Sequence, residues 1–258
     1  MYRSKTWYFN NSIEYEFTFK GNYGKKGEKR AKRQKATPEQ IKKQNQKNKE
    51  NAVRRLMKAN WKENDYWLTL KFPAGTKMKI KEVKEKLSLF LRRTRNAYKR
   101  KGEMFKFIYR IEIGKRGSPH VHILVNRISE ADLIIKKNWE YGGVYFGLAY
   151  EEGGFRKLAE YIVKPPDEEV DPEGETVAYN TSRNLIRPEP EIKPYWRRTV
   201  EKMIKEGPKP TLGYAIDPNT IVSGVNPYTG MSYLKYEEIK LERSGQGARG
   251  KRIRGDNS

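Results

Sequence analysis

The chain contains the run Gly117-Ser118-Pro119-His120-Val121-His122-Ile123-Leu124-Val125, which holds its only two histidines. This run predicts a β-strand. Because side chains of a strand alternate between two faces, His120 and His122 share one face while Val121 points the other way into a core. The pattern is that of a two-imidazole metal site on an otherwise apolar strand, although a His-x-His pair can also arise by chance on a solvated strand.

A second strand precedes the histidines. The run Phe107-Ile108-Tyr109-Arg110-Ile111-Glu112-Ile113 alternates, with Arg110 and Glu112 on the less apolar face. Residues 114–119 are rich in turn formers, so we expect an antiparallel hairpin that sets Glu112 beside the imidazoles. Two imidazoles and a carboxylate predict a divalent-metal site without selecting the metal. The absence of cysteine removes the usual structural zinc cages.

Residues 155–164 predict a short amphipathic helix that ends at Pro165-Pro166. Its apolar residues recur at helical spacing, and the opposite stripe contains Lys157, Tyr161 and Lys164. A tyrosine is therefore presented beside two ammonium groups. The alternative is an ordinary amphipathic helix with a half-exposed tyrosine.

Taken together, His120-Val121-His122 and Tyr161-Ile162-Val163-Lys164 resemble the motifs of the HUH endonuclease superfamily. The resemblance covers roughly residues 60–190 and is to the single-tyrosine rolling-circle replication initiators of bacterial plasmids, phages and related mobile elements. It implies that His120, His122 and Glu112 hold Mg²⁺ or Mn²⁺, with Glu112 the weaker assignment. It also implies that Tyr161 is the nucleophile and that Lys164 assists it.

This resemblance implies a metal-dependent endonuclease and strand transferase that acts on single-stranded DNA at a replication origin, in a hairpin. A phenol is a weak nucleophile at neutral pH, so it needs a neighbouring cation, a base or a polarised target. The expected product is a 5′-phosphotyrosine with a free 3′-hydroxyl, from which a host polymerase extends. Only Tyr161 is visible as a nucleophile on its helix, so termination would use a second protomer, water or another tyrosine.

Composition favours a nucleic-acid substrate independently. Lys and Arg number 55 against 32 Asp and Glu, which gives a formal charge of +23, as in proteins that neutralise phosphates. Ribosomal, nucleoid and membrane-surface proteins share this trait. Basic residues on or near the motif-bearing segments are the candidate DNA contacts: Lys157, Arg110, Arg116, Lys115 and Arg183.

The expected fold is α+β, a ferredoxin-like β-α-β-β-α-β core with an antiparallel sheet, helices on one face and the active site on the other, bare face. Its expected elements are strands at 66–72, 105–113, 120–126 and 144–150, with helices at 77–101, 129–138 and 155–164.

Four segments are expected along the chain. Residues 1–60 form a basic N-terminal extension with a strand near 13–19, a linker at 25–36 and a basic helix from about 38 to 60 opened by a capping box at Thr37-Pro38-Glu39-Gln40. Residues 61–190 form the nuclease domain. Residues 191–243 contain a helix at 191–206 and a small β unit that turns at 226–230, and residues 244–258 form a basic disordered tail.

Two other functions remain open from the sequence. A relaxase or a single-strand transposase would use the same chemistry for a different task. A non-catalytic, basic nucleic-acid-binding protein would bind DNA in a salt-sensitive manner and form no covalent adduct. No helicase module is visible, so a host helicase is an expected partner, and with no membrane span or leader the default expectation is a cytoplasmic location.

Overall fold

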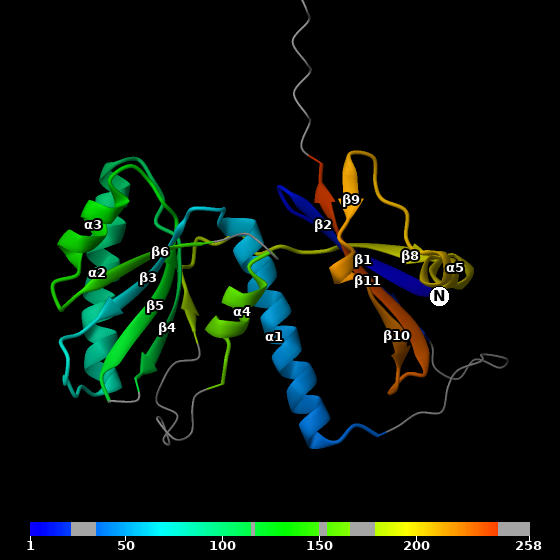
Figure 1. Ribbon diagram of the computed structural model, residues 1–258, viewed down its shortest axis with the longest axis horizontal. Coiled ribbons are helices and arrows are strands. Elements are labelled where there is room, and N and C mark those ends of the chain that lie inside the picture. The colour runs from blue at the N-terminus through cyan, green and yellow to red at the C-terminus, as the bar shows by residue number, and fades with distance from the viewer. Residues whose placement is uncertain (22–34, 115–116, 150–153, 166–178, 242–258) are drawn as a thin grey trace, which may run out of the picture. The chain divides into compact units, whose positions relative to one another are not determined.

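The computed structural model describes residues 1–21, 35–114, 117–149, 154–165 and 179–241, and these form two compact units (Figure 1). One unit comprises residues 35–189. The other combines residues 1–34 with residues 190–258. The expected basic tail, and most of the linker expected at 25–36, lie outside the described residues.

The unit of residues 35–189 is built on a five-stranded antiparallel sheet with the strand order β6-β3-β5-β4-β7. The strands are β3 (Tyr66–Lys71), β4 (Phe107–Ile113), β5 (Pro119–Val125), β6 (Val144–Leu148) and β7 (Asn180–Thr181). Its helices are α1 (Pro38–Asn60), α2 (Ile80–Arg100), α3 (Ala131–Asn138) and α4 (Arg156–Ile162). The element order from β3 to β6 is the expected β-α-β-β-α-β, and the expected α+β class is confirmed.

Helices cover both faces of this sheet, whereas the sequence predicted one bare face (Figure 1). On one face Leu68 and Ile123 enter a core with residues of α2 and α3. On the other, Ile108 and Leu124 enter a second core with residues of α1 and α4. The histidine face is therefore partly covered, because its strands also carry apolar side chains that α1 and α4 bury.

Helix α1 has the expected capping box, since Thr37 Oγ1 accepts from the Gln40 backbone and the Gln40 side chain accepts from the Thr37 backbone. Its first turns are exposed. Val53 and Met57 in its second half are buried against α4. The helix therefore belongs to the central unit, and its position differs from the separate N-terminal extension expected from its polar composition.

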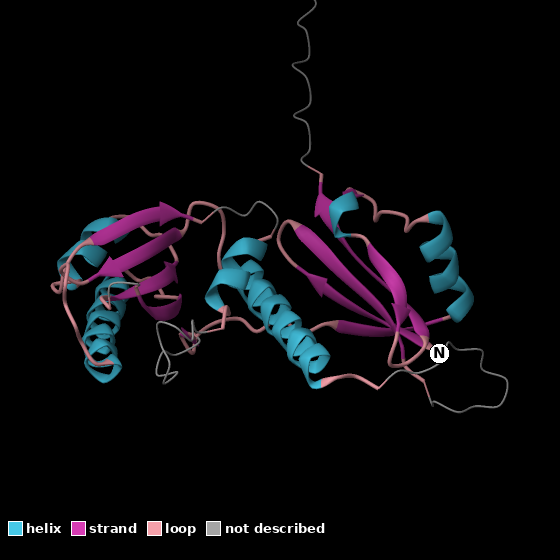
Figure 2. Cartoon of the chain, turned by 60° about the horizontal axis from the view of Figure 1, so that its bottom comes forward, coloured by secondary structure: helices cyan, strands magenta, loops and turns pink. Residues whose placement is uncertain are grey.

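The second unit contains a six-stranded antiparallel sheet with α5 (Arg197–Glu206) packed against it (Figure 2). Its strands are β1 (Tyr2–Tyr8), β2 (Ser12–Phe19), β8 (Glu191–Tyr195), β9 (Tyr214–Ile216), β10 (Val222–Asn226) and β11 (Met231–Lys240), with a 3₁₀ turn η1 (Pro218–Thr220). Strand β1 lies between β2 and β8, so the N-terminal strands and the C-terminal segment share one sheet. This organisation differs from the separate segments expected at 1–60 and 191–243.

The helix expected at 191–206 is wrong in its first part. Residues 191–195 form β8 at the sheet edge, and α5 begins only at Arg197. Pro194 explains the difference, because proline disfavours a helical conformation at the residue before it and is tolerated on an edge strand. The turn expected at 226–230 is confirmed between β10 and β11.

Candidate metal and tyrosine site

The hairpin of β4 and β5 brings Glu112 directly opposite His120 and Arg110 directly opposite His122. The turn between the strands is closed by Gly114 and Ser118, and Gly117 takes a φ of 76°, which favours glycine. With this register, the carboxylate and both imidazoles lie on one face of the sheet. The hairpin predicted from the turn-forming residues is confirmed.

Glu112, His120 and His122 form a cluster that could hold a metal ion, and their ligand atoms lie within 4.8 Å of one another. Glu112 Oε2 is 3.5 Å from Nε2 of each histidine. Two ligand atoms bound to one cation at about 2.1 Å lie roughly 3.0–3.4 Å apart at octahedral or tetrahedral angles. The cluster therefore fits a divalent cation with little rearrangement, and its mixed nitrogen and oxygen donors do not select the metal.

Tyr161 lies against this cluster from α4. Its hydroxyl donates to Glu112 Oε2 over 2.7 Å, and its ring contacts the His122 ring edge-on at 5.0 Å. Burial, with the Glu112 carboxylate next in size, raises the pKa of Tyr161. The phenol is thus neutral in the metal-free site and lies beside the place where a cation would bind.

The start of α4 depends on an unusual backbone conformation. Gly154 and Phe155 both have positive φ, at 62° and 61°, so the helix begins at Arg156. A left-handed conformation costs a bulky residue on the order of 1–3 kcal/mol. The Phe155 ring is only 1% exposed in the core beneath α1, and its burial offsets this cost.

Arg110 was expected to contact DNA, and its position differs from that expectation because the residue is only 4% exposed. Its Nε is 2.8 Å from Glu112 Oε1. Its terminal nitrogens donate to the carbonyl oxygens of Ile162, Lys164 and Pro165 at the end of α4. Arg110 therefore connects the acidic residue of the cluster to the helix that carries Tyr161.

The charges around Glu112 determine its protonation. Burial by itself would raise the pKa of Glu112, but hydrogen bonds with His120 and Tyr161 and the Arg110 charge outweigh it and lower the pKa to about 2. Burial and the neighbouring His120 lower the pKa of His122 to about 4. At neutral pH the cluster therefore contains an ionised carboxylate and a neutral His122, the states that bind a metal.

The pattern of motifs did not point to Trp67 and Thr69, which lie on β3 beside the histidines. Thr69 Oγ1 is 3.2 Å from His122 Nδ1, and the Trp67 ring stacks on His122 at 5.6 Å. If His122 binds a cation through Nε2, its Nδ1–H donates to Thr69, which fixes the ring orientation. The alternation of β3 places both residues on one face, but only the pairing of β3 with β5 shows which face that is.

The other expected residues are separate from the cluster. Lys157 and Lys164 are exposed, and the Lys164 carbonyl is held by Arg110. Arg183 is exposed beyond β7, beside a pocket on the opposite face of the sheet. Lys115 and Arg116 lie outside the described residues.

Residues 65–166 match the family model of replication-associated proteins of the ORF2 type. The matched segment begins just before β3 and ends beyond α4, so it contains Glu112, both histidines and Tyr161. No curated protein and no solved structure gives a significant match. Among the described residues, no helix has both the length and the apolar character needed to cross a membrane. The similarity is thus to replication-associated proteins, over the segment that holds the candidate site.

Proposed function

We propose that this protein starts rolling-circle replication as a metal-dependent, single-tyrosine endonuclease and strand transferase for single-stranded DNA. One observation carries the proposal: Glu112 Oε2 accepts the Tyr161 hydroxyl at 2.7 Å and lies 3.5 Å from Nε2 of both histidines. A nucleophile beside a metal-binding cluster is what transfer of a phosphodiester to tyrosine requires. The match to replication-associated proteins supports the replication role over that of a relaxase or transposase.

Glu112, His120 and His122 would hold Mg²⁺ or Mn²⁺, which when bound polarises a phosphate oxygen and orients the scissile group. Tyr161 Oη attacks the phosphorus, a new bond forms between them, and the bond from phosphorus to the 3′-oxygen breaks. The phenol proton passes to solvent, and the leaving oxygen takes up a proton to become a 3′-hydroxyl. Neutralisation of the Glu112 charge would remove one cause of the raised Tyr161 pKa and so favour the phenolate.

The strand order β6-β3-β5-β4, with α2 and α3 on one face, supports assignment of this unit to the ferredoxin-like core of HUH nucleases. Exposed Lys157 and Lys164 are proposed phosphate contacts, with Lys164 steadying the scissile group. Tyr161 is the one tyrosine in α4, so strand rejoining would use another protomer or a tyrosine outside this helix. A host helicase and polymerase would open the origin hairpin and extend the 3′-end.

The test is to incubate the protein with labelled single-stranded DNA from both flanks of its own gene, with Mn²⁺ or with chelator. A denaturing gel should show a protein-linked fragment that requires metal and disappears in Tyr161→Phe. Tyr145→Phe is the matched control, because Tyr145 is an exposed tyrosine on β6 of the same sheet. Salt-sensitive binding with no adduct would instead support a non-catalytic DNA-binding protein, and an adduct that persists in Tyr161→Phe would overturn the assignment of the nucleophile.

A further inference from the structure

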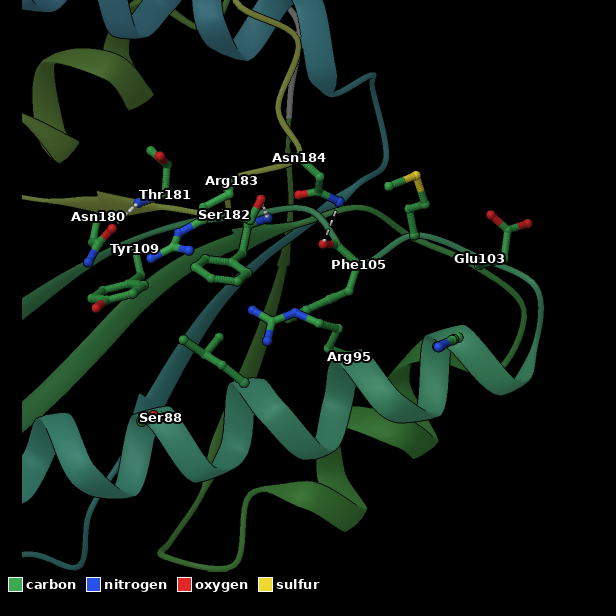
Figure 3. A pocket seen from close by; sticks show the side chains of 14 residues that line it. Ser88, Arg95, Glu103, Phe105, Tyr109, Asn180, Thr181, Ser182, Arg183 and Asn184 are labelled. Carbon is green, nitrogen blue, oxygen red and sulfur yellow. Dashed lines mark hydrogen bonds between the residues drawn. The ribbon is translucent and has the colours of Figure 1, made fainter.

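A second site lies on the sheet face opposite the histidines. There a pocket of about 830 Å³ is enclosed by α2, the beginning of β4 and residues 180–184 (Figure 3). Phe107 and Tyr109, which line it, point into the core that β4 shares with α2, whereas Arg110 and Glu112 point to the other face. The volume is within the range of about 300–1,000 Å³ that is typical of ligand pockets.

The walls of this pocket combine an apolar floor with a cationic rim. Leu91, Phe105, Phe107 and Tyr109 contribute carbon surface, and all four are buried. Arg95, Lys99 and Arg183 at the rim are exposed, and Glu103 is the only carboxylate in the lining. Such walls suit a ligand with a flat apolar part and negative charges.

The cations lie on both sides of the pocket. Arg95 and Lys99 project from α2, and Arg183 comes from the segment after β7 on the opposite wall (Figure 3). A base within a strand has a phosphate on each side, so cations on two walls match it better than they match a ligand with one charged end.

Asn184 adds an incomplete hydrogen-bonding group. Its Nδ2 donates to the Phe105 carbonyl oxygen at 3.2 Å. Its Oδ1 is buried and, among the described residues, has no hydrogen-bond partner. A buried acceptor without a partner is costly, and the exocyclic amino groups of nucleobases are donors that would satisfy it.

We propose that this pocket binds an unpaired nucleotide of single-stranded DNA, with the base on the apolar floor and the flanking phosphates at Arg95, Lys99 and Arg183. The proposal rests on the proposed function for its choice of polymer, single-stranded DNA. Duplex DNA does not fit, because its bases are stacked within the helix and cannot reach the floor. The pocket thus holds the strand at a point away from the cleaved bond.

Binding is measured by fluorescence anisotropy with full-length Tyr161→Phe protein, in chelator, and a labelled oligothymidylate of about 12 nucleotides. The pocket variant is Arg95→Ser with Lys99→Ser. The matched control is Arg92→Ser with Arg100→Ser, which removes the same charge from exposed positions of α2 outside the pocket. We expect roughly tenfold weaker binding for the pocket variant and less than about threefold for the control. Equal losses would overturn the proposal.

Crosslinking with 5-iodouracil in the same oligonucleotide provides a readout that does not depend on charge. We expect crosslinked peptides from residues 103–109 or 179–184, and crosslinks confined to other regions would overturn the proposal. So would competition by thymidine monophosphate at the same concentration as the oligonucleotide, or an equal effect of the pocket variant on duplex binding. Because Tyr161→Phe forms no phosphotyrosine, failure of these tests is distinct from failure of the nicking assay.

Discussion

Arg110 Nε lies 2.8 Å from Glu112 Oε1, two positions along the same strand, and both side chains lie on the face that carries the histidines. The same guanidinium holds the carbonyl oxygens at the end of α4. One buried cation therefore determines both the position of the acidic residue and the position of the helix that carries Tyr161.

Removal of one partner of this pair should destabilise the protein more than removal of both. Arg110→Met leaves the Glu112 carboxylate without its ion pair and should cost about 3–5 kcal/mol of unfolding free energy. The double variant Arg110→Met, Glu112→Gln should be more stable than the sum of the single effects by at least about 1 kcal/mol. Urea denaturation in chelator measures all three variants, and strictly additive effects would contradict the coupling.

Thr69 should tune metal affinity without binding the metal. Thr69→Val removes the hydroxyl beside His122 Nδ1 and should weaken Mn²⁺ binding by about tenfold or more, since partners of ligating histidines contribute on this scale. Thr69→Ser keeps the hydroxyl and is the control. Titration of Mn²⁺ followed by electron paramagnetic resonance distinguishes the two variants, and an unchanged affinity in Thr69→Val would refute the role.

His122 should titrate far below the ordinary range in the metal-free protein. Burial and His120 lower its pKa to about 4, so its imidazole should stay neutral at pH 6. An unfolded histidine takes up its proton near pH 6.5, so the folded state should lose stability as pH falls from about 6.5 to about 4. NMR titration of the two histidines, assigned with His120→Gln, checks this, and a His122 midpoint near 6.5 would contradict it.

Trp67 should help to hold the nucleophile in place. Its ring meets Tyr161 edge-on at 6.0 Å and stacks on His122. Such aromatic contacts contribute about 0.5–1.5 kcal/mol, so Trp67→Leu should slow adduct formation by roughly two- to tenfold. Trp67→Phe, which retains an aromatic ring, should recover most of the rate in the same gel assay. A leucine variant as fast as wild type would show that the ring has no positioning role.

Sequence periodicity predicted the central sheet well. The alternation in residues 107–113 and 119–125 requires that Glu112 and both histidines share a face once the hairpin forms, and the hairpin turn is local. The helical spacing of residues 155–164 similarly predicted α4, although Phe155 lies just before the helix because of its left-handed backbone. Signals that depend on near neighbours were therefore sufficient for these elements.

Features that depend on distant partners could not be predicted in this way. Arg110 is buried because α4, more than 40 residues later in the chain, offers it carbonyl oxygens. Strand β1 was missed because Ser4 and Thr6 occupy buried positions where alternation predicts apolar residues. Which helices cover the histidine face likewise follows from tertiary packing of α1 against α4.

The pairing of β1 and β2 with β8 and β11 affects the order of folding during synthesis. The ribosome makes the first two strands early, but their outer partners emerge only after residues 35–189. The central unit can therefore fold while the β1–β2 hairpin still has open edges and exposed Tyr2 and Phe17, a state prone to association with other chains. The nascent protein would thus contain a folded catalytic unit between an incomplete sheet and the strands that complete it.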